Sequence, residues 1–330
     1  MQYKITIGEY RVVALDSVTI IKSVENLADT ATIVIPGAYI NKSLHIEDKI
    51  HEGDAVEIHL GYDYDILLEF KGYVNSISTD DSTIKIECED ALYLFRKSLK
   101  DIEYKAINVN TLLTNVCNEI NGINKDNGTL TNYKPNCNFD YTYQKFVLYK
   151  ATGLDVLKKI QEETKANIYF EDNILHVHPQ YEYIVNEKPV IFDFARNIEK
   201  SDLKYIKAVD KNIEVEVSMT LPDGTKKTEK IGKSGGHKIN KIVNAANEES
   251  LKNAAKNEYN IWVYDGYEGS FTGWLIPYVE PACKINLHDN EYQDKDGNYY
   301  KDGNYYVVAT ETKFSSSGGE RKTILGRKIG

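Results

Sequence analysis

The first part of the chain, up to about Cys88, alternates between hydrophobic and polar positions with a period of two. The segments Tyr3 to Ile7, Val56 to Leu60 and Ile84 to Cys88 follow this pattern. Because successive side chains of a strand lie on opposite faces, each segment predicts a strand with one hydrophobic face. Turn residues separate the segments, which favours antiparallel pairing. A short helix from Asp90 to Leu99 is expected to close this region.

The next stretch changes to the spacing of an amphipathic helix. Hydrophobic residues from Val109 to Ile120 recur three or four positions apart, Asn108 precedes them and Gly122 follows them. Asparagine is a favoured N-cap and glycine commonly ends a helix, so the pattern predicts a helix that stops before Gly122. The polar residues 121–135 are expected to form an exposed loop.

A second helix is expected to begin after Thr152, because a threonine hydroxyl can cap a helix when an acidic residue, here Asp155, lies three positions later. Two short strands follow, at Asn167 to Phe170 and at Ile174 to Val177. Helices and short strands together predict a small α+β region.

From about Val190 the alternation with a period of two returns. Leu221 to Gly224 carries the residues of a hairpin turn. A third helix then interrupts the strands, with Asn247 as its expected N-cap and two glutamates in its first turn. Strands are expected again at Cys283 to Leu287 and at Tyr305 to Thr312.

The two alternating regions share one order of elements. In each, an alternating strand leads into an acidic turn that bears tyrosine, and a strand with a Tyr-Val pair and a further alternating strand follow. The two pairs are Tyr73-Val74 and Tyr306-Val307. Self-similarity in a fixed order is typical of a duplicated unit. The pattern therefore predicts two related β regions in one chain.

These observations predict a mainly β fold with an α+β insert. Residues 1–100 are expected to form a first tube-like β-barrel and residues 101–189 a small central α+β domain. Residues 190–330 are expected to form a second, similar tube-like β-barrel that includes a helix at about 247–262.

Composition narrows the class of protein. Hydrophobic residues make up 42% of the chain and charged residues 27%, which is typical of globular proteins and argues against disorder. The formal net charge of -10 argues against a general nucleic-acid surface, because such surfaces depend on clustered lysine and arginine. The 25 tyrosines favour strands and partner contacts. The four cysteines show neither metal-binding nor disulfide spacing, and the sequence predicts neither a signal peptide nor a membrane span.

Three motifs fit a catalytic or metal-binding pattern only in part. Gly232 to Gly236 matches the string GxSxG, but the next predicted helix begins too late for a nucleophile elbow, which favours a flexible surface loop. His176 and His178 share one face of a strand without a third ligand, which favours a half-exposed strand face. Asp294 to Asn298 begins like a calcium loop but has Tyr305 where a glutamate is needed. The sequence therefore predicts no catalytic, cofactor-binding or metal-binding residue.

Aromatic residues gather in one segment of the last region. The candidates for an interface are Trp262, Tyr264, Tyr267, Phe271 and Trp274. Aromatic side chains of this kind anchor protein partners. Aromatic side chains could equally cover the open end of the second barrel. The sequence therefore leaves two interpretations open, a partner interface and a barrel cover.

Several of these segments resemble one known family. They are Gly53 to Ile58 leading to Phe70 to Val74, Gly153 to Ile160, and Tyr264 to Phe271. In their order the chain resembles, over nearly its whole length, the late control protein D family of phage baseplate hubs. The same fold forms the first part of type six secretion spike proteins.

The resemblance implies a structural protein with no enzymatic activity and no cofactor. Such hubs are homotrimers in which two barrels per chain build a ring of near-sixfold symmetry, and the ring joins a tail tube to a spike. The implied partners are further copies of this chain, the spike protein, a tube or tube-initiator protein, and other baseplate proteins. DNA or cargo would pass through the lumen without specific binding, and no membrane insertion is expected. The implied location is the tail or baseplate, assembled in the bacterial cytoplasm.

Two other classes of function remain open at this point. A tail-associated hydrolase would depend on Ser234 or on the pair of histidines. A receptor-binding or carbohydrate-binding β protein would use the abundant tyrosine and tryptophan.

Overall fold

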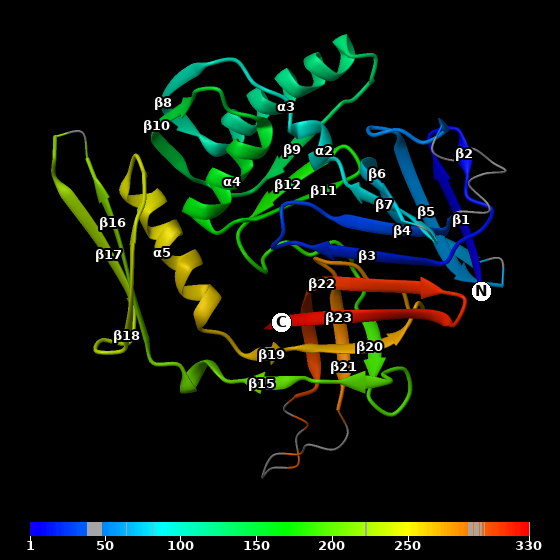
Figure 1. The fold of residues 1–330 in the computed structure, drawn as a ribbon. Coiled ribbons are helices and arrows are strands. Elements are labelled where there is room, and N and C mark those ends of the chain that lie inside the picture. The colour runs from blue at the N-terminus through cyan, green and yellow to red at the C-terminus, as the bar shows by residue number, and fades with distance from the viewer. Residues whose placement is uncertain are drawn as a thin grey trace. The chain divides into compact units, whose positions relative to one another are not determined.

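The computed structural model describes residues 1–329 except positions 38–47, 64, 81, 222, 290–292, 294–296, 298 and 300. The chain divides into two compact units. Unit 1 contains Met1–Tyr93, Ile184–Lys204 and Tyr267–Gly330, and unit 2 contains Leu94–Tyr183 and Tyr205–Gly266. Figure 1 shows the elements of both units. The division into three consecutive domains expected from the sequence stays a prediction.

Unit 1 consists mainly of strands. Its first segment contains β1 (Gln2–Ile7), β2 (Tyr10–Arg11), β3 (Ser17–Ser23), β4 (Thr30–Pro36), β5 (Ala55–Tyr62), β6 (Asp65–Thr79) and β7 (Thr83–Glu89). Its later segments contain β13 (Val190–Asp193), β14 (Lys200–Ser201), β20 (Ser270–Trp274), β21 (Lys284–His288), β22 (Gly303–Ser315) and β23 (Gly318–Ile329). The short elements α2 (Leu92–Phe95), β15 (Lys204–Ile206) and β19 (Gly266–Glu268) lie where the chain passes from one unit to the other.

One order of strands occurs twice in unit 1. We call β1 and β3 to β7 repeat A, and we call β13, β14 and β20 to β23 repeat B. Hydrogen-bonded neighbours run β1-β5-β6-β7-β4-β3 in repeat A and β13-β21-β22-β23-β20-β14 in repeat B. Both paths visit their strands in the same chain order, so the repeated arrangement predicted from the sequence is present. The first pair differs, because β1 and β5 are antiparallel whereas β13 and β21 are parallel.

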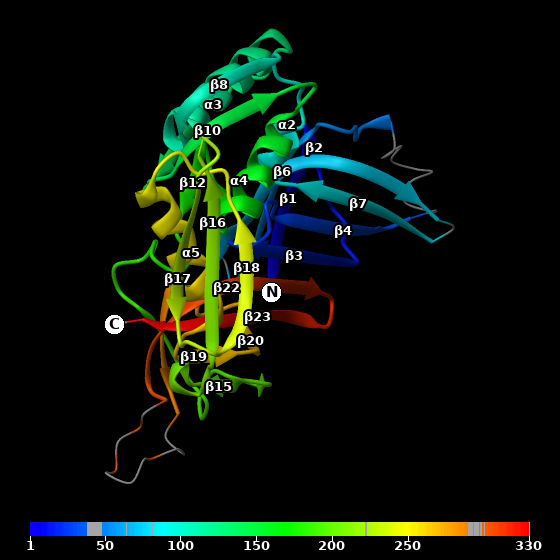
Figure 2. The same ribbon diagram turned by 90° about the vertical axis from the view of Figure 1, so that its left-hand side faces the viewer.

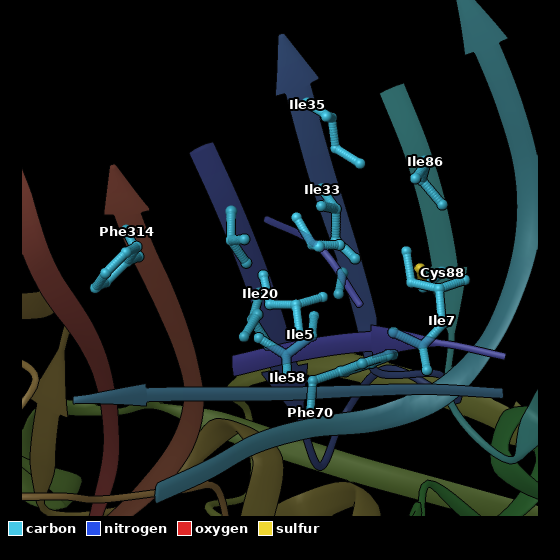
Figure 3. Close-up of a cluster of buried hydrophobic side chains, with 14 of the residues drawn as sticks. Ile5, Ile7, Ile20, Ile33, Ile35, Ile58, Phe70, Ile86, Cys88 and Phe314 are labelled. Carbon is cyan, nitrogen blue, oxygen red and sulfur yellow. The ribbon is translucent and has the colours of Figure 1, made fainter. Parts of the chain in front are cut away.

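The core of repeat A is aliphatic. Alternate residues of its strands are buried, including Ile5 and Ile7 of β1 and Ile33 and Ile35 of β4. In Figure 3 these side chains point into one cluster, and Phe314 from β22 lies at its edge. Each fully buried side chain of this size contributes about 1.5–3 kcal/mol, so the alternation read from the sequence is also the main source of stability.

The core of repeat B is richer in aromatic rings. The ring centroids of Phe192 and Phe271 lie 4.7 Å apart, and those of Tyr267 and Tyr305 lie 5.0 Å apart. All four side chains are buried. Tilted aromatic pairs at these distances add about 0.5–1.5 kcal/mol each beyond their buried area. The two repeats therefore use one strand order with different side-chain chemistry.

Unit 2 contains the helix α3 (Val109–Asp126), whose N-terminus is capped as predicted. The side chain of Asn108 accepts a hydrogen bond from the amide of Asn110. The prediction that the helix ends before Gly122 is wrong, because the helix continues for another turn. Gly122 faces open space within the helix, so the position does not need glycine to end the helix.

Two asparagines explain why this last turn of α3 forms. The side-chain oxygen of Asn121 accepts a hydrogen bond from the amide of Tyr133 at 2.8 Å, and the amide group of Asn124 donates to the hydroxyl of Thr131. These bonds hold the following segment against the helix, so residues 121–135 are not simply an exposed loop. A polar side chain that satisfies backbone groups is hard to tell from a solvated one by sequence alone.

The second helix, α4 (Gly153–Thr164), begins with the predicted capping box of Thr152 and Asp155. It leads to β11 (Asn167–Glu171) and β12 (Ile174–His178), which pair as an antiparallel hairpin. The strand β9 (Lys134–Cys137) adds to β12 in parallel. The small α+β region predicted from the sequence is therefore present.

The rest of unit 2 comprises a two-stranded sheet and a three-stranded sheet. The strand β8 (Ile102–Asn108) pairs with β10 (Thr142–Leu148), and β16 (Ile213–Thr220) lies between β17 (Lys226–Gly232) and β18 (His237–Ile242). A short 3-10 turn, Ala208–Asp210, precedes β16. The helix α5 (Glu248–Trp262) starts at the predicted cap Asn247 and packs against β16 and β17 (Figure 2). Of the predicted turn between β16 and β17, Pro222 lies outside the described residues.

Some elements differ from the sequence-based expectation. The expected helix from Asp90 to Leu99 is shorter, because it begins where Asp90 accepts a hydrogen bond from the amide of Leu92 and ends before Ser98, which pairs with Thr152. The strands β8, β9, β10 and β18 were not predicted, since their buried positions do not alternate regularly over enough residues. The mainly β class with a small α+β region is confirmed, whereas the tube-like barrels stay a prediction.

Within the described ranges, no helix is both long and apolar enough to span a membrane.

Candidate functional site

The two repeats are joined edge to edge through β3 and β22. These strands pair in antiparallel register from Ser17 opposite Ser315 to Ser23 opposite Ala309. On the same side of β22, residues Gly303 to Tyr306 pair with β21. The long strand β22 thus pairs first within its own repeat and then with repeat A, which makes one continuous sheet.

A β-bulge marks the same position in both repeats. In β6 the pairing with β7 shifts by one residue between Val74 and Ser76, and in β22 the pairing with β23 shifts between Val307 and Ala309. Each bulge directly follows the Tyr-Val pair that the two regions share, Tyr73-Val74 in β6 and Tyr306-Val307 in β22. A bulge bends its strand and increases the local twist, so both long strands curve at equivalent places. From the shared bulge onward, this equivalence aligns β6 with β22 residue by residue; before it, β22 has a further shift, between Tyr305 and Val307, that β6 lacks.

A buried ion pair also links the repeats. Arg321 of β23 donates two hydrogen bonds to the carboxylate of Glu69 in β6, at 2.7 and 3.1 Å, and a third to the hydroxyl of Thr312. The side chains of Arg321 and Glu69 are only 3% and 2% exposed. The guanidinium also lies 4.8 Å from the ring of Tyr278. Removing one partner of a buried pair leaves an uncompensated charge, so this contact makes each repeat depend on the other.

A second group of charges lies around the loop between β3 and β4. Asp29 accepts a hydrogen bond from the amide of Ser23 and donates its own amide to the carboxylate of Asp90. Burial raises the pKa of Asp29 to about 6, against the opposing attraction of Lys22. Burial and the neighbouring charge of Asp29 also raise the pKa of Asp90. Lys22 in turn lies 3.6 Å from Glu280.

The histidines His176 and His178 face one another in the interior of unit 2. His176 Nδ1 lies 3.1 Å from His178 Nε2, and His178 Nδ1 lies 2.5 Å from the side-chain oxygen of Asn138. Both imidazoles are 1% exposed, so the expectation of a half-exposed strand face is wrong. Burial lowers the pKa of His178 to about 4, with a further contribution from His176. The bond to Asn138 places a proton on Nδ1 of His178, so its Nε2 accepts from His176.

Aromatic rings enclose this histidine pair. His176 stacks on Tyr169 with centroids 4.8 Å apart, and His178 stacks on Tyr183 at 4.0 Å. Glu171 contributes a carboxylate oxygen 3.2 Å from His176 Nε2. Within the described part of the chain, no three histidine, cysteine or acidic side chains gather in a metal-binding arrangement. The pair is therefore built like a hydrogen-bonded core.

The GxSxG string forms the tight connection between β17 and β18. Gly232 has a φ of 110°, and a side chain there would meet the carbonyl oxygen of Ile213 at 2.3 Å. The amide of Gly235 donates to Glu214. A strand follows this turn, whereas a nucleophile elbow leads into a helix, and Ser234 is exposed. The segment is an exposed connection between two strands, which agrees with the expected surface loop, and its flexibility stays a prediction. The calcium-like segment lies largely outside the described residues.

The five aromatic interface candidates fall into two groups. Tyr267 and Phe271 are 2% and 1% exposed and belong to the core of repeat B. Trp262 at the end of α5 and Trp274 at the end of β20 are 46% and 50% exposed, and Tyr264 is partly buried. The described contacts do not gather all five on one surface. An interface role stays a prediction, and exposure restricts it to Trp262, Tyr264 and Trp274.

Unit 2 also contains an open groove of about 920 Å³ beside β8 and β10. Lys105, Lys145 and Lys159 contribute positive charge to it. Lys145 is paired with Glu103, and Lys159 lies 4.3 Å from the ring of Phe146. Lys145 and Lys159 thus have partners within the chain, and the carboxylate of Glu103 also lines the groove, so the groove does not define an anion site.

Sequence reasoning missed the residues that join the repeats. Glu69 lies in a hydrophobic run and Arg321 in an alternating strand, and both occupy inward-facing positions. A charged residue at a buried position of a strand requires a partner of opposite charge. The requirement for a partner could be inferred for Glu69 and for Arg321 separately from the sequence. The sequence does not show that these two residues are each other's partner.

Comparison with known proteins shows which class of fold this arrangement belongs to. No protein-family model matches the chain. No curated protein matches it either. Among solved structures, the fold is shared by phage tail proteins and by a component of the type VI secretion system.

Three of these structures illustrate the likeness. A tail protein from Neisseria meningitidis MC58 aligns with a TM-score of 0.67 at 14% identity, over 99% of this chain and 97% of its own. The 43 kDa tail protein of prophage MuSo2 from Shewanella oneidensis gives 0.66 at 14%, over 99% and 98%. An E. coli component of the type VI secretion system gives 0.59 at 9%, over 99% and 77%. At the level of the fold, the resemblance to baseplate hubs is confirmed.

Proposed function

We propose that this protein is a structural hub subunit of a phage tail or a related injection machine. Three copies form a ring of near-sixfold symmetry that connects a tail tube to a spike and surrounds a conduit. The ring belongs to a tail or baseplate that assembles in the bacterial cytoplasm. The chain acts mechanically and not as an enzyme, and it needs no cofactor.

The repeated strand order in unit 1 carries this proposal. A spike with threefold symmetry and a tube with sixfold symmetry do not match directly. A chain that contains two equivalent repeats resolves the mismatch, because three chains present six near-equivalent positions. The likeness in fold to phage tail proteins and to a secretion-system component supports the same conclusion.

Charge supports the conduit. The net charge of -10 makes the chain repel anionic polymers, and a ring of such chains lets DNA or acidic cargo pass without binding. The partners in this proposal are two further copies of the chain, the spike, the tube or its initiator, and neighbouring baseplate proteins.

The oligomeric state tests the proposal directly. Light scattering coupled to size-exclusion chromatography should give three times the mass of one chain, alone or with spike protein. A chain that stays monomeric at every concentration and does not bind spike protein would contradict the hub function.

A further inference from the structure

We propose that neighbouring copies of this chain join by pairing the β14 edge of one copy with the β6 edge of the next. This inference rests on the proposed function and specifies its interface. The occupant of both edges is a second copy, because the chain already contains a working example of the same contact.

That example is the junction of β3 with β22. The two strands hold equivalent places to β14 and β6, since β3 and β14 end the paths of repeats A and B, while β22 and β6 are the long bulged strands. Within one chain, repeat A offers β3 to repeat B. If the same relation continues around a ring, repeat B offers β14 to repeat A of the next chain. A head-to-tail contact of this kind gives a closed ring when a whole number of rotations from one repeat to the next makes 360°.

Both edges have room for this pairing. The strand β6 pairs with β5 over Asp65–Tyr73 and with β7 over Tyr73–Thr79. On the side of β6 that faces β5, the described strand pairings stop before Asn75. At the equivalent place in β22, the pairing with β21 ends and the pairing with β3 begins. Among the described strands, β14 pairs on one side only, with β20. Both Lys200 and Ser201 of β14 are exposed.

The register of the contact follows from the alignment of the repeats. Counting from the bulge, Ser76 corresponds to Ala309, so Ser78 corresponds to Glu311. The equivalence of Lys200 and Ser17 follows by counting across the sheet. Lys200 lies opposite Thr272, which lies opposite Lys322 of β23. Ser17 lies opposite Val34, which lies opposite Lys85 of β7, the residue that matches Lys322. Lys204 is the first residue of β15, which follows β14 and, among the described strands, pairs with β19 only. By the same count, Lys204 corresponds to Ile21.

Within the chain, Ile21 lies opposite Glu311. The contact between chains therefore places Lys204 of one copy opposite Ser78 of the next. Both side chains are exposed in the single chain. Exposed strand edges invite association, so joining the two edges in a closed ring also removes two sites of uncontrolled aggregation.

Engineered cysteines test this register. Directly opposite residues of antiparallel strands have Cβ atoms about 4.5–5.5 Å apart, close enough for a disulfide after small adjustment. The full chain carrying both Lys204→Cys and Ser78→Cys should, after mild oxidation, shift from a single chain to covalent dimers and trimers on a non-reducing gel. A closed ring should end the series at three chains.

Matched variants provide the controls. Ile21→Cys with Glu311→Cys places the same pair at the junction inside one chain, so it should oxidise without any increase in mass. Each single variant should give no trimer, and the unmodified chain sets the background from its native thiols.

The outcomes separate the interface from the function. A trimer by light scattering without covalent trimers from the double variant would overturn the β14–β6 contact and leave the hub proposal standing. A chain that is monomeric with and without spike protein would overturn both. Covalent species that extend beyond three chains would support the edges but contradict the closed ring.

Discussion

Repeats A and B share a strand order but differ in how the chain uses it. In repeat A the chain passes from β3 to β4 through the short segment Val24–Asp29, whereas in repeat B residues 205–266 of unit 2 come between β14 and β20. The core of repeat A is mostly isoleucine and valine, while that of repeat B relies on tilted pairs of tyrosine and of phenylalanine rings. Strand order and bulge position have thus been kept where side chains have not.

This difference indicates what each feature is for. An interior tolerates exchange between aliphatic and aromatic residues when its total volume is preserved. Pairing edges must keep their register, because a slip of one residue moves every side chain to the other face. Two repeats that must pair through equivalent strand edges are therefore expected to share strand order and bulge position, while the side chains of their cores differ.

The strongest test of the comparison removes the ion pair between the repeats. Arg321→Met should destabilise unit 1 by about 3–5 kcal/mol, because Glu69 remains buried without its partner. Urea unfolding followed by circular dichroism measures this change. Adding Glu69→Met should recover much of the loss.

An exposed ion pair is the control for this experiment. Lys85→Met removes the contact with Glu87, in which both side chains are nearly half exposed, and should change stability by less than about 1 kcal/mol. If Arg321→Met were as mild as Lys85→Met, the repeats would not depend on each other.

Equivalent core positions test whether the two repeats are also energetically equivalent. The alignment matches Ile33 of β4 with Phe271 of β20. Phe271→Ala should cost about 3–5 kcal/mol and Ile33→Ala about 2–5 kcal/mol, since each leaves a cavity in a packed core. The same unfolding measurement on both variants, and on the double variant, gives the comparison. Losses in only one repeat would mean that only one core supports unit 1.

A buried carboxyl group in repeat A should give unit 1 an unusual dependence on pH. The pKa of Asp29 in the folded chain, about 6, lies above its ordinary value of 3.8. Its contribution is therefore fully present below the ordinary value and is lost as pH rises through 6. Comparing the wild type with Asp29→Asn at pH 4.5 and 7 should show a change of about 2 kcal/mol in their difference in stability.

Asp223, in the turn between β16 and β17, offers a control of opposite sign. The amide of Thr225 lowers the pKa of Asp223, so its contribution is lost as pH falls. Asp223→Asn should therefore shift the pH profile in the other direction. Parallel profiles for the two variants would argue against a buried Asp29.

The smallest effect on stability is expected at Trp274. This side chain is half exposed, so Trp274→Ser should change the free energy of unfolding by less than about 0.5 kcal/mol. If Trp274 anchors a further copy of the chain in the proposed trimer, dilution should dissociate the variant's trimer at a higher concentration than that of the wild type. An unchanged trimer would restrict the aromatic interface to Trp262 and Tyr264.

Much of this fold could be predicted from local pattern. The caps Asn108, Thr152 and Asn247 each begin a helix where the sequence indicated, because the capping signal lies within a few residues. The order of strands that the sequence predicted around Tyr73-Val74 and Tyr306-Val307 is also present in the structure. Both signals are local, and physical chemistry links them directly to backbone conformation.

The rest depended on contacts between distant segments. The strand β8 has few buried positions and therefore lacks a clear alternation. The end of α3 is set by Asn121 and Asn124, which bond to residues beyond the helix. The division of unit 2 between two separate segments cannot be inferred from any one stretch.

The ion pair of Glu69 and Arg321 has a consequence for biosynthesis. The two residues are 252 positions apart, so a growing polypeptide presents Glu69 long before Arg321 has been translated. Until β23 leaves the ribosome, the sheet of repeat A cannot close over that carboxylate without a large penalty. Completion of the first half of the molecule is thereby tied to synthesis of the second, and prematurely terminated products are left unable to reach the native state.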